Sequence, residues 1–521
     1  MRTSILVVMI VLTSIITSAQ TYWQQQTNYK IDVSLDDKRH TLKGFLSIEY
    51  INNSPDTLEF IWFHLWPNAY KNKETAYAKQ ILKDAEGKKR WREMKDNGYI
   101  DSLDFKVDGK KATLQMDEEN IDVAKLILPD LLIPGTKMLI TTPFFVKIPT
   151  YSSRSGHIGN SYMICQWYPK PAVYDRKGWH PMPYLDQGEF YSEFGTFTVN
   201  LTVPAAYVIG ATGTMKNEEE RALYQDIGKK NQEGTLTKYR ALPPTAKKTL
   251  SFTADNVHDF AWFADKDFII RYDTALLDNG KVIDVYTYSF EKGNPNWKSS
   301  IRYVEDAVRS YSRWVGTYPY QVAQAVEGPA NLMSGGMEYP TITLITSPRA
   351  DEPELDGVIA HEVGHNWFYG ILASNERDHP WMDEGINTYY QFRYEAEKHR
   401  SNSFMGSYLP DQLKTVSPEE LLATIYTTIS TVPIDHAIET PSSGFSNEED
   451  YAMTAYIKAA TWMYVVEVSI GKEKLEKVMR SYFEKWKFKH PYPEDLKAEF
   501  ELITGMGFDE IFGLLQKKGS L

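Results

Sequence analysis

Two histidines one helical turn apart are the clearest chemical feature of the sequence. The segment Val358 to Phe368 reads Val-Ile-Ala-His-Glu-Val-Gly-His-Asn-Trp-Phe, with His361 and His365 four residues apart. In an α-helix both imidazoles project from one face, so they can coordinate one zinc ion at about 2.0–2.1 Å. Glu362 follows the first histidine, where its carboxylate can activate water for attack on a peptide bond. The pattern is typical of a hydrolytic zinc site.

Two histidines leave zinc under-coordinated, so the chain must supply a third ligand. The obvious candidate is Glu384, in the segment Trp-Met-Asp-Glu-Gly-Ile-Asn that begins at Trp381. A second helix that carries Glu384 would have to pack against the first. The neighbouring Asp383 is expected to point away if Glu384 points in. The alternative is a surface helix with two unrelated histidines, and the apolar residues that flank the motif argue against it.

A glycine-rich anionic segment lies just upstream of the histidines. It reads Ser-Gly-Gly-Met-Glu-Tyr-Pro and supplies four candidate substrate-binding residues, which are Gly335, Gly336, Met337 and Glu338. Glycines let a backbone approach a ligand closely, and an edge strand at residues 341–345 could then hold an extended peptide. The Glu338 carboxylate could pair with the α-ammonium group of a substrate. This predicts an enzyme that recognises peptides with a free N-terminus. The alternative is a plain glycine turn with a solvated Glu338.

The amino-acid composition limits the classes of protein to which the chain can belong. Apolar residues make up 42% of the 521 residues and charged residues 24%, which is ordinary for a globular protein of several domains. The formal net charge of −12 repels phosphate backbones, so no nucleic acid is expected as a partner. Cys165 is the only cysteine, which excludes an intramolecular disulfide and predicts a buried thiol in the core.

Residues 1–19 read as a secretory signal peptide. A positive charge at Arg2 precedes an apolar run from Ser4 to Ile16, and small residues lead to Ala19. We expect cleavage after Ala19 and export to the periplasm or the outside of the cell. An uncleaved membrane anchor is the alternative, but the apolar run is short, and no later segment is a candidate membrane span.

Two hydrophobic periods divide the rest of the chain. Apolar and polar residues alternate at positions such as Ile31 to Leu35, which predicts strands. A helical period begins at Ile301. We therefore predict an α+β multidomain fold, with a β-rich domain over residues 20–268 and a mainly helical domain over residues 269–521.

Two charged insertions interrupt the β-rich part of the chain. We expect residues 71–97 to be partly helical and residues 216–238 to form a long exposed hairpin. Both are predicted to be solvated surface rather than binding sites for a partner.

Together these motifs resemble the gluzincin aminopeptidases, the family of membrane alanyl aminopeptidase and leukotriene hydrolase. The resemblance implies a saddle-like β-rich N-terminal domain, a thermolysin-like zinc catalytic domain, one zinc ion per chain and peptide substrates with a free N-terminus. It also implies that Glu338 binds the amino terminus of the substrate. In the segment Tyr-Ile-Lys-Ala-Ala, Tyr456 is similar to the family tyrosine that stabilises the oxyanion, and Tyr451 is a weaker candidate.

The chain departs from the family pattern at several points. Tyr339 stands where better-studied members carry Asn, and Asn-Trp-Phe-Tyr from Asn366 replaces Gln-Trp-Phe-Gly, which leaves the substrate preference open. The run that begins at Gln166 resembles an N-domain segment near the active site, so Gln166 is a further candidate for binding the amino terminus. Two other functions remain open: a zinc endopeptidase with the same catalytic residues, and a non-catalytic peptide-binding protein of the same fold.

Overall fold

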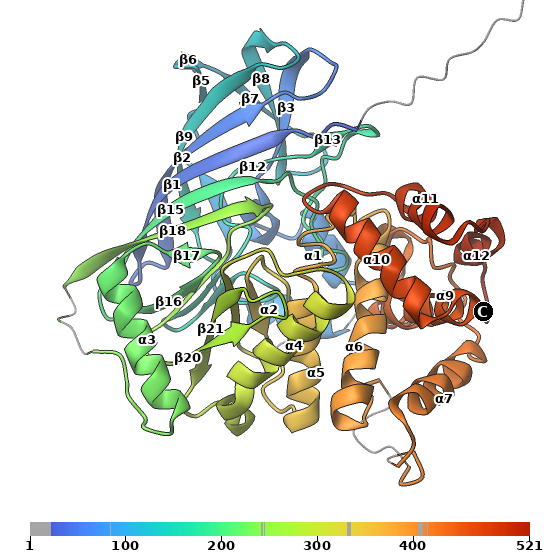
Figure 1. Ribbon diagram of the computed structural model, residues 1–521. Coiled ribbons are helices and arrows are strands. Elements are labelled where there is room, and N and C mark those ends of the chain that lie inside the picture. The colour runs from blue at the N-terminus through green and yellow to red at the C-terminus, as the bar shows by residue number, and fades with distance from the viewer. Residues whose placement is uncertain are drawn as a thin grey trace, which may run out of the picture.

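The computed structural model describes residues 22–83, 85–240, 243, 245–330, 335–404, 410–413 and 415–521. The predicted signal peptide lies outside this part of the chain. Sheets dominate the first part of the molecule and helices the second, and the two parts pack side by side (Figure 1). Among the described residues, no helix is both long and apolar enough to cross a bilayer.

The largest sheet of the β-rich part has nine strands. Its strands run in the order β17-β18-β15-β1-β2-β9-β5-β6, with β4 also paired to β9. Ile31, Val33 and Leu35 are buried on one face of β1, which confirms the predicted alternation. The strands are β1 (Gln26–Asp36), β2 (Thr41–Ile51), β4 (Tyr99–Asp101), β5 (Lys106–Val107), β6 (Lys110–Lys111), β9 (Lys137–Lys147), β15 (Gly195–Pro204), β17 (Thr214–Met215) and β18 (Lys247–Val257).

Three smaller sheets complete the β-rich part. One contains β3 (Leu58–His64), β7 (Thr113–Met116), β8 (Val123–Leu132) and β12 (Lys170–Pro171); the next contains β10 (Gly156–Ile158), β11 (Ser161–Ile164), β16 (Val208–Ala211) and β19 (Trp262–Asp265); the last pairs β13 (Tyr174–Asp175) with β14 (Gly178–Trp179). Their shared hydrophobic core includes the buried Cys165, as predicted, and extends to Met337 and Tyr339. The β-rich part therefore supports the segment that carries Glu338.

The two charged insertions fold differently from each other. The first contains α1 (Ala76–Ile81) and α2 (Ala85–Glu93), after a 3-10 turn η1 (Trp66–Tyr70), which confirms partial helicity. The predicted hairpin at 216–238 is wrong, because this segment forms the helix α3 (Glu218–Gln232). Acidic residues fill its first turn and lysines its last, which suits the helix dipole, and its apolar face packs against the strand β20.

A five-stranded sheet follows, in the order β20-β21-β22-β24-β23. Its strands are β20 (Phe268–Leu276), β21 (Val282–Phe290), β22 (Val322–Glu327), β23 (Gly336–Met337) and β24 (Ile342–Ile345). The predicted edge strand at 341–345 is wrong, because β24 lies between β22 and β23. The free edge belongs instead to β23, inside the glycine-rich segment. A domain boundary at residues 268 and 269 stays a prediction.

The helices of the second part surround a separate hydrophobic core. They are η2 (Pro295–Ser299), α4 (Ser300–Trp314), α5 (Glu352–Gly364), η3 (Pro380–Met382), α6 (Glu384–His399), α7 (Pro418–Ser430), η4 (Ser442–Gly444), α8 (Glu448–Tyr451), the π-helical η5 (Ala452–Lys458), α9 (Ala459–Ile470), α10 (Lys472–Trp486), α11 (Pro493–Thr504), α12 (Asp509–Gly513) and η6 (Leu514–Gln516). Helix α5 packs between α4 and α6, and α6 packs against α9 (Figure 1). This core fixes the two helices predicted to carry zinc ligands.

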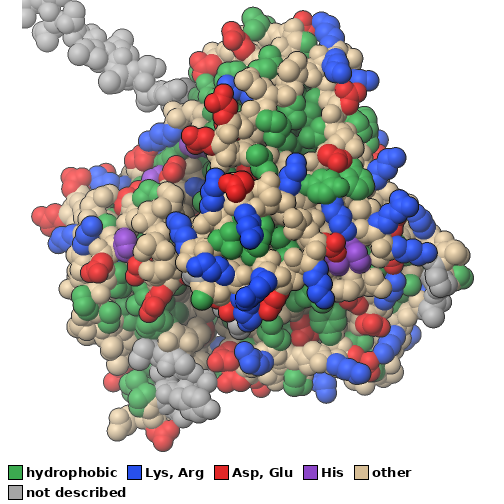
Figure 2. All heavy atoms as spheres, turned by 180° about the vertical axis from the view of Figure 1, so that it is seen from behind, with side chains coloured by type: hydrophobic (Ala, Val, Ile, Leu, Met, Phe, Trp, Pro, Cys, Tyr) green, Lys and Arg blue, Asp and Glu red, His purple; other side chains and the backbone are tan. Residues whose placement is uncertain are grey.

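The surface carries both signs of charge. Lysine and arginine side chains are interspersed with aspartate and glutamate across the face seen in Figure 2. This mixture is typical of a solvated surface.

Candidate metal centre and cleft

Helix α5 presents both histidines of the motif from one face. Its start is set by a capping box, in which Asp351 and Glu354 each accept the other's backbone N–H. The apolar residues Leu355, Ile359 and Val363 anchor the opposite side in the helical core. The histidines are consequently directed toward α6.

Three side chains converge as the sequence predicts. The Nε2 atoms of His361 and His365 lie 3.0 Å apart, and Glu384 Oε2 lies 3.3 and 3.2 Å from them. Glu384 is the first residue of α6, and the Asn387 side chain on the same helix donates a hydrogen bond to the His361 carbonyl at 2.8 Å. This bond ties the start of α6 to the end of α5.

The donor set of this triad fits a zinc ion. His361 Nδ1 faces Gln391 Oε1 at 2.8 Å and His365 Nδ1 faces Asp383 Oδ1 at 2.6 Å, so both Nδ1 atoms are assigned as proton donors. Both Nε2 lone pairs then point at each other and at a carboxylate oxygen, an arrangement that only a cation stabilises. Tetrahedral zinc with bonds of about 2.0–2.1 Å requires donor separations of roughly 3.3 Å, close to those observed.

The expectation that Asp383 points away from the site is wrong. Its backbone kinks between η3 and α6, so adjacent carboxylates are not forced onto opposite sides. Asp383 is fully buried, and its carboxylate contacts His365 Nδ1, the ring nitrogen that does not face the other metal ligands. A carboxylate in this position fixes the tautomer and raises the basicity of a metal-binding histidine.

We expect the Asp383→Asn variant to bind zinc about 10- to 100-fold more weakly, because its side chain is a poorer acceptor for His365 Nδ1–H. Competition with a fluorescent chelator measures this affinity. Asp378→Asn, which makes the same change at an exposed aspartate whose Oδ2 accepts a hydrogen bond from Asn375, serves as the matched control. An unchanged zinc affinity in Asp383→Asn would contradict the assigned role.

Glu362 lies against the glycine-rich segment. A Cβ at Gly336 would lie 2.5 Å from the Glu362 carboxylate, so only glycine allows this approach. Glu362 is buried, its Oε2 has no hydrogen-bond partner, and burial raises the pKa of its carboxyl to about 8. It also faces the cleft beside His361 and His365. Its free oxygen can accept a proton from a molecule bound there once the carboxyl group is ionised, which a zinc ion beside it would favour.

Glu338 lies directly after β23 and opens into the same cleft. It is buried, its Oε1 atom has no partner, and burial raises the pKa of its carboxyl well above the usual range. The solvated alternative for Glu338 is therefore excluded. A buried, unpartnered carboxylate is stabilised by a cationic ligand.

The two candidate tyrosines bind different carboxylates. Tyr456, in the π-helical segment η5, donates its hydroxyl to Glu384 Oε1 at 2.6 Å, and its ring stacks on His361 at 6.0 Å. Tyr451 donates instead to Glu376 Oε1 at 2.8 Å. Only Tyr456 contacts the metal triad, and π-helical turns of this kind often occur at functional sites.

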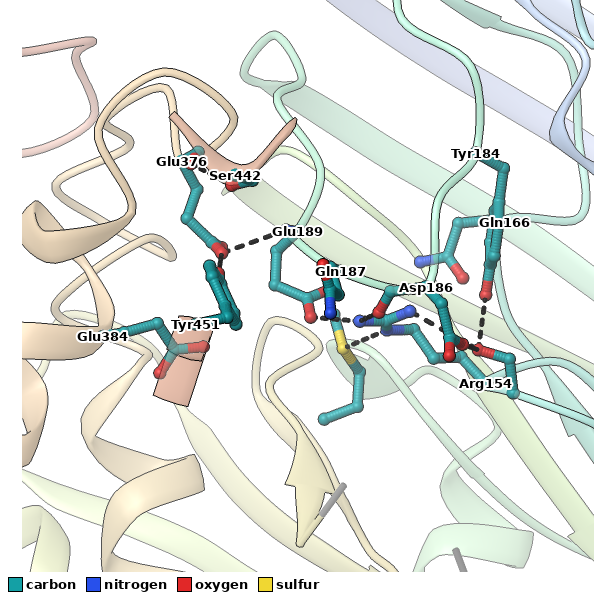
Figure 3. Close-up of polar contacts among 12 residues, drawn as sticks. Arg154, Gln166, Tyr184, Asp186, Gln187, Glu189, Glu376, Glu384, Ser442 and Tyr451 are labelled. Carbon is teal, nitrogen blue, oxygen red and sulfur yellow. Dashed lines mark hydrogen bonds and ion pairs between the residues drawn. The ribbon is translucent and has the colours of Figure 1, made fainter. Parts of the chain in front are cut away.

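The cleft between the two parts of the molecule has a volume of about 330 Å³. The β-rich part contributes one wall, which consists of Ser153, Arg154, Asp186, Gln187, Gly188 and Glu189. Gln166 is buried and is not among the residues that line the cleft; its Oε1 accepts a hydrogen bond from the Tyr339 hydroxyl at 3.0 Å. Figure 3 shows Gln166 beside Tyr184 and Arg154, which is one of the wall residues. A contact between Gln166 and a substrate amine stays a prediction.

Several site residues escape prediction from sequence. Asp383 and Gln391 orient the histidines, and a carboxylate beside a zinc ligand is a signal that could have found Asp383. The wall residues Arg154 and Glu189 come from loops remote from every motif. Glu376 lies between the two ligand helices with no motif of its own.

Comparisons with known proteins show which family the chain resembles. Residues 309–513 match the Peptidase family M1 domain, which confirms the predicted resemblance to the gluzincin aminopeptidases. The chain is 24% identical over 193 residues to leucine aminopeptidase 2 of Yarrowia lipolytica and 27% identical over 191 residues to a leukotriene A-4 hydrolase homolog of Botryotinia fuckeliana. These matches cover 36% and 35% of this chain, but only 29% and 27% of the length of those curated relatives.

Solved structures share the fold over nearly the whole chain. A variant of an M1 zinc metallopeptidase from Deinococcus radiodurans has a TM-score of 0.65 at 14% identity, with 96% of this chain and 95% of that chain covered. The same enzyme was solved with a Tyr-Ser-Ala substrate, at a TM-score of 0.63. The predicted α+β multidomain fold is therefore confirmed. The family implies one catalytic zinc ion, and the His361, His365 and Glu384 donor set fits it.

Proposed function

We propose that the chain is a zinc-dependent aminopeptidase that removes N-terminal residues from peptides. The observation that carries the proposal is the position of Glu338, whose buried carboxylate opens into the same cleft as the metal triad. A free α-ammonium group is the peptide feature that such a carboxylate selects. The relatives named leucine aminopeptidase support the same reaction class.

In this proposal each of the site residues has a defined part in the reaction. His361, His365 and Glu384 would hold the zinc ion, which would supply the Lewis acidity that polarises a carbonyl and makes a water molecule more acidic. Glu362 accepts a proton from the attacking water and later passes it to the leaving amine. The Tyr456 hydroxyl donates to the charge that develops on the carbonyl oxygen. Glu338 holds the substrate amine and so sets the position of the first peptide bond.

Paired substrates test the proposal. We expect hydrolysis of peptides with a free N-terminus and, because acetylation removes the charge that Glu338 recognises, at least about 100-fold slower cleavage of the same peptides after N-acetylation. Mass spectrometry of the products identifies the bond cut. Equal cleavage of both forms would favour the endopeptidase, and binding without hydrolysis would favour the non-catalytic protein.

We also propose that the protein is exported, with residues 1–19 removed. The proposal rests on the sequence pattern of these residues alone. Mass spectrometry of the protein recovered from its native cells checks it: a first residue at Gln20 is expected, and an intact N-terminus would contradict it.

A further inference from the structure

Glu395 is a buried carboxylate on α6 to which the proposed reaction gives no part. Its Oε1 atom accepts a hydrogen bond from the side-chain amide of Gln391 at 2.8 Å, and its Oε2 atom accepts one from the Ser403 backbone N–H at 2.7 Å. Burial raises the pKa of this carboxyl to about 7, and the two donors favour its ionised form. Both oxygens therefore act as acceptors when the group is ionised.

The amide of Gln391 has a partner for each of its polar atoms. Its Nε2 atom donates to Glu395 Oε1 and also to Ser403 Oγ at 3.1 Å, while its Oε1 atom faces His361 Nδ1 at 2.8 Å. If the amide turned over, its carbonyl would face a carboxylate that has no proton to donate. Only one orientation of the amide therefore satisfies the ionised Glu395.

This orientation decides which nitrogen of His361 carries the proton. The amide oxygen accepts from Nδ1–H, which leaves the lone pair on Nε2, the atom that faces His365 and Glu384. A reversed amide would donate to Nδ1 and leave the proton on Nε2. A protonated Nε2 cannot bind a metal ion, so the reversed amide is incompatible with the triad.

Helix α5 leaves room for the Glu395 carboxylate. Gly357 lies one helical turn before His361, and a Cβ at Gly357 would be 2.5 Å from Glu395 Oε1. Any larger residue at this position would push the carboxylate away from Gln391. The contact between α5 and α6 thus admits Glu395 at the point where it can reach the amide.

We propose that Glu395 is a positioning residue of the metal centre, which fixes the Gln391 amide and thereby keeps the His361 proton on Nδ1. Glu395 acts through Gln391 and touches neither the metal nor the substrate. The inference rests on the zinc ligands of the proposed function and is independent of the peptide that is cleaved.

The variant Glu395→Gln tests this role, with zinc affinity measured by competition with a chelator at pH 8, where the wild-type carboxyl is ionised. The new amide has nearly the shape of the carboxylate but only one acceptor oxygen, so it cannot accept from both Ser403 N–H and Gln391. Loss of a partner beyond the metal ligands costs about 10- to 100-fold in affinity, and we expect about tenfold here because the action is indirect.

Exchanging the two side chains separates positioning from packing. In the double variant Gln391→Glu with Glu395→Gln, a carboxylate faces His361 Nδ1–H directly and can only accept, so the required tautomer is restored. We expect a zinc affinity within about threefold of the wild type. Glu397→Gln makes the same charge change at an exposed position of α6, where Glu397 pairs with Arg393, and should leave the affinity unchanged.

Ser403→Ala supplies an independent test at an exposed position. It removes the hydroxyl that accepts the second amide proton of Gln391, so zinc affinity should fall about threefold. This variant decides the matter if Glu395→Gln does not fold.

The outcomes separate the possible errors. Unchanged zinc affinity in Glu395→Gln, or in Ser403→Ala where the first variant does not fold, would overturn the inference. A weakened affinity that the exchanged pair does not restore would also overturn it, because it indicates a packing role. A wild-type protein that binds no zinc would instead refute the metal centre of the proposed function itself.

Discussion

Replacing Glu362 with glutamine is expected to lower kcat by about 1,000-fold. The amide has nearly the shape of the carboxylate but cannot accept a proton at neutral pH, and loss of a general base costs about 100- to 10,000-fold. Glu362 fits this role because it is buried beside the metal triad, with one oxygen free and a close approach to Gly336. A continuous assay with an aminoacyl fluorogenic substrate measures the effect.

The Glu362→Gln variant must keep its zinc for this result to be informative. Glu362 is not among the three side chains that converge as metal ligands, so the zinc content should match that of the wild type. The affinity for an aminoacyl hydroxamate, an inhibitor that chelates zinc, should stay within a few-fold, since chelation does not use the base. A variant that retains more than a tenth of the wild-type kcat would exclude Glu362 as the general base.

The second large effect is expected from His365→Ala. His365 is 1% exposed and supplies the most enclosed ligand of the triad. Its removal leaves two donors, so zinc binding and hydrolysis should both be lost. A bound metal stabilises the native state by mass action, by about 4 kcal/mol at a thousandfold excess over Kd. Addition of zinc should therefore raise the Tm of the wild type and leave that of His365→Ala unchanged.

His399 provides a matched histidine control. It ends α6, the helix that begins with the ligand Glu384, and pairs with Asp356 rather than with the triad. His399→Ala should cost some stability but retain one zinc per chain and the zinc-dependent rise in Tm. A His365→Ala protein that still binds one zinc with wild-type affinity would contradict the assigned ligand set.

The metal triad could be predicted from sequence because its geometry is mostly local. The spacing of His361 and His365 fixes their relation within one helix, and a short second motif offers Glu384 as the third ligand. The strands near Ile31 and the helix that contains Ile301 follow equally local periods. Where apolar residues recur with a clear helical or strand period, the predicted element is present and its apolar face is buried.

Features that depend on long-range packing could not be predicted in this way. The charged segment that forms α3 reads as a hairpin until its apolar face is seen against β20. Asp383 turns inward because the backbone bends before α6. The partners of Glu376 come from residues 187 and 75 positions away in the chain. A short stretch of sequence does not predict contacts between residues so far apart in the chain.

Anomalous diffraction at the zinc absorption edge tests the central claim most directly. From crystals of the zinc-loaded protein, we predict one strong peak about 2.0–2.1 Å from the Nε2 atoms of His361 and His365 and at a similar distance from Glu384 Oε2. A peak elsewhere, or none between these three atoms in a protein that contains stoichiometric zinc, would contradict the account.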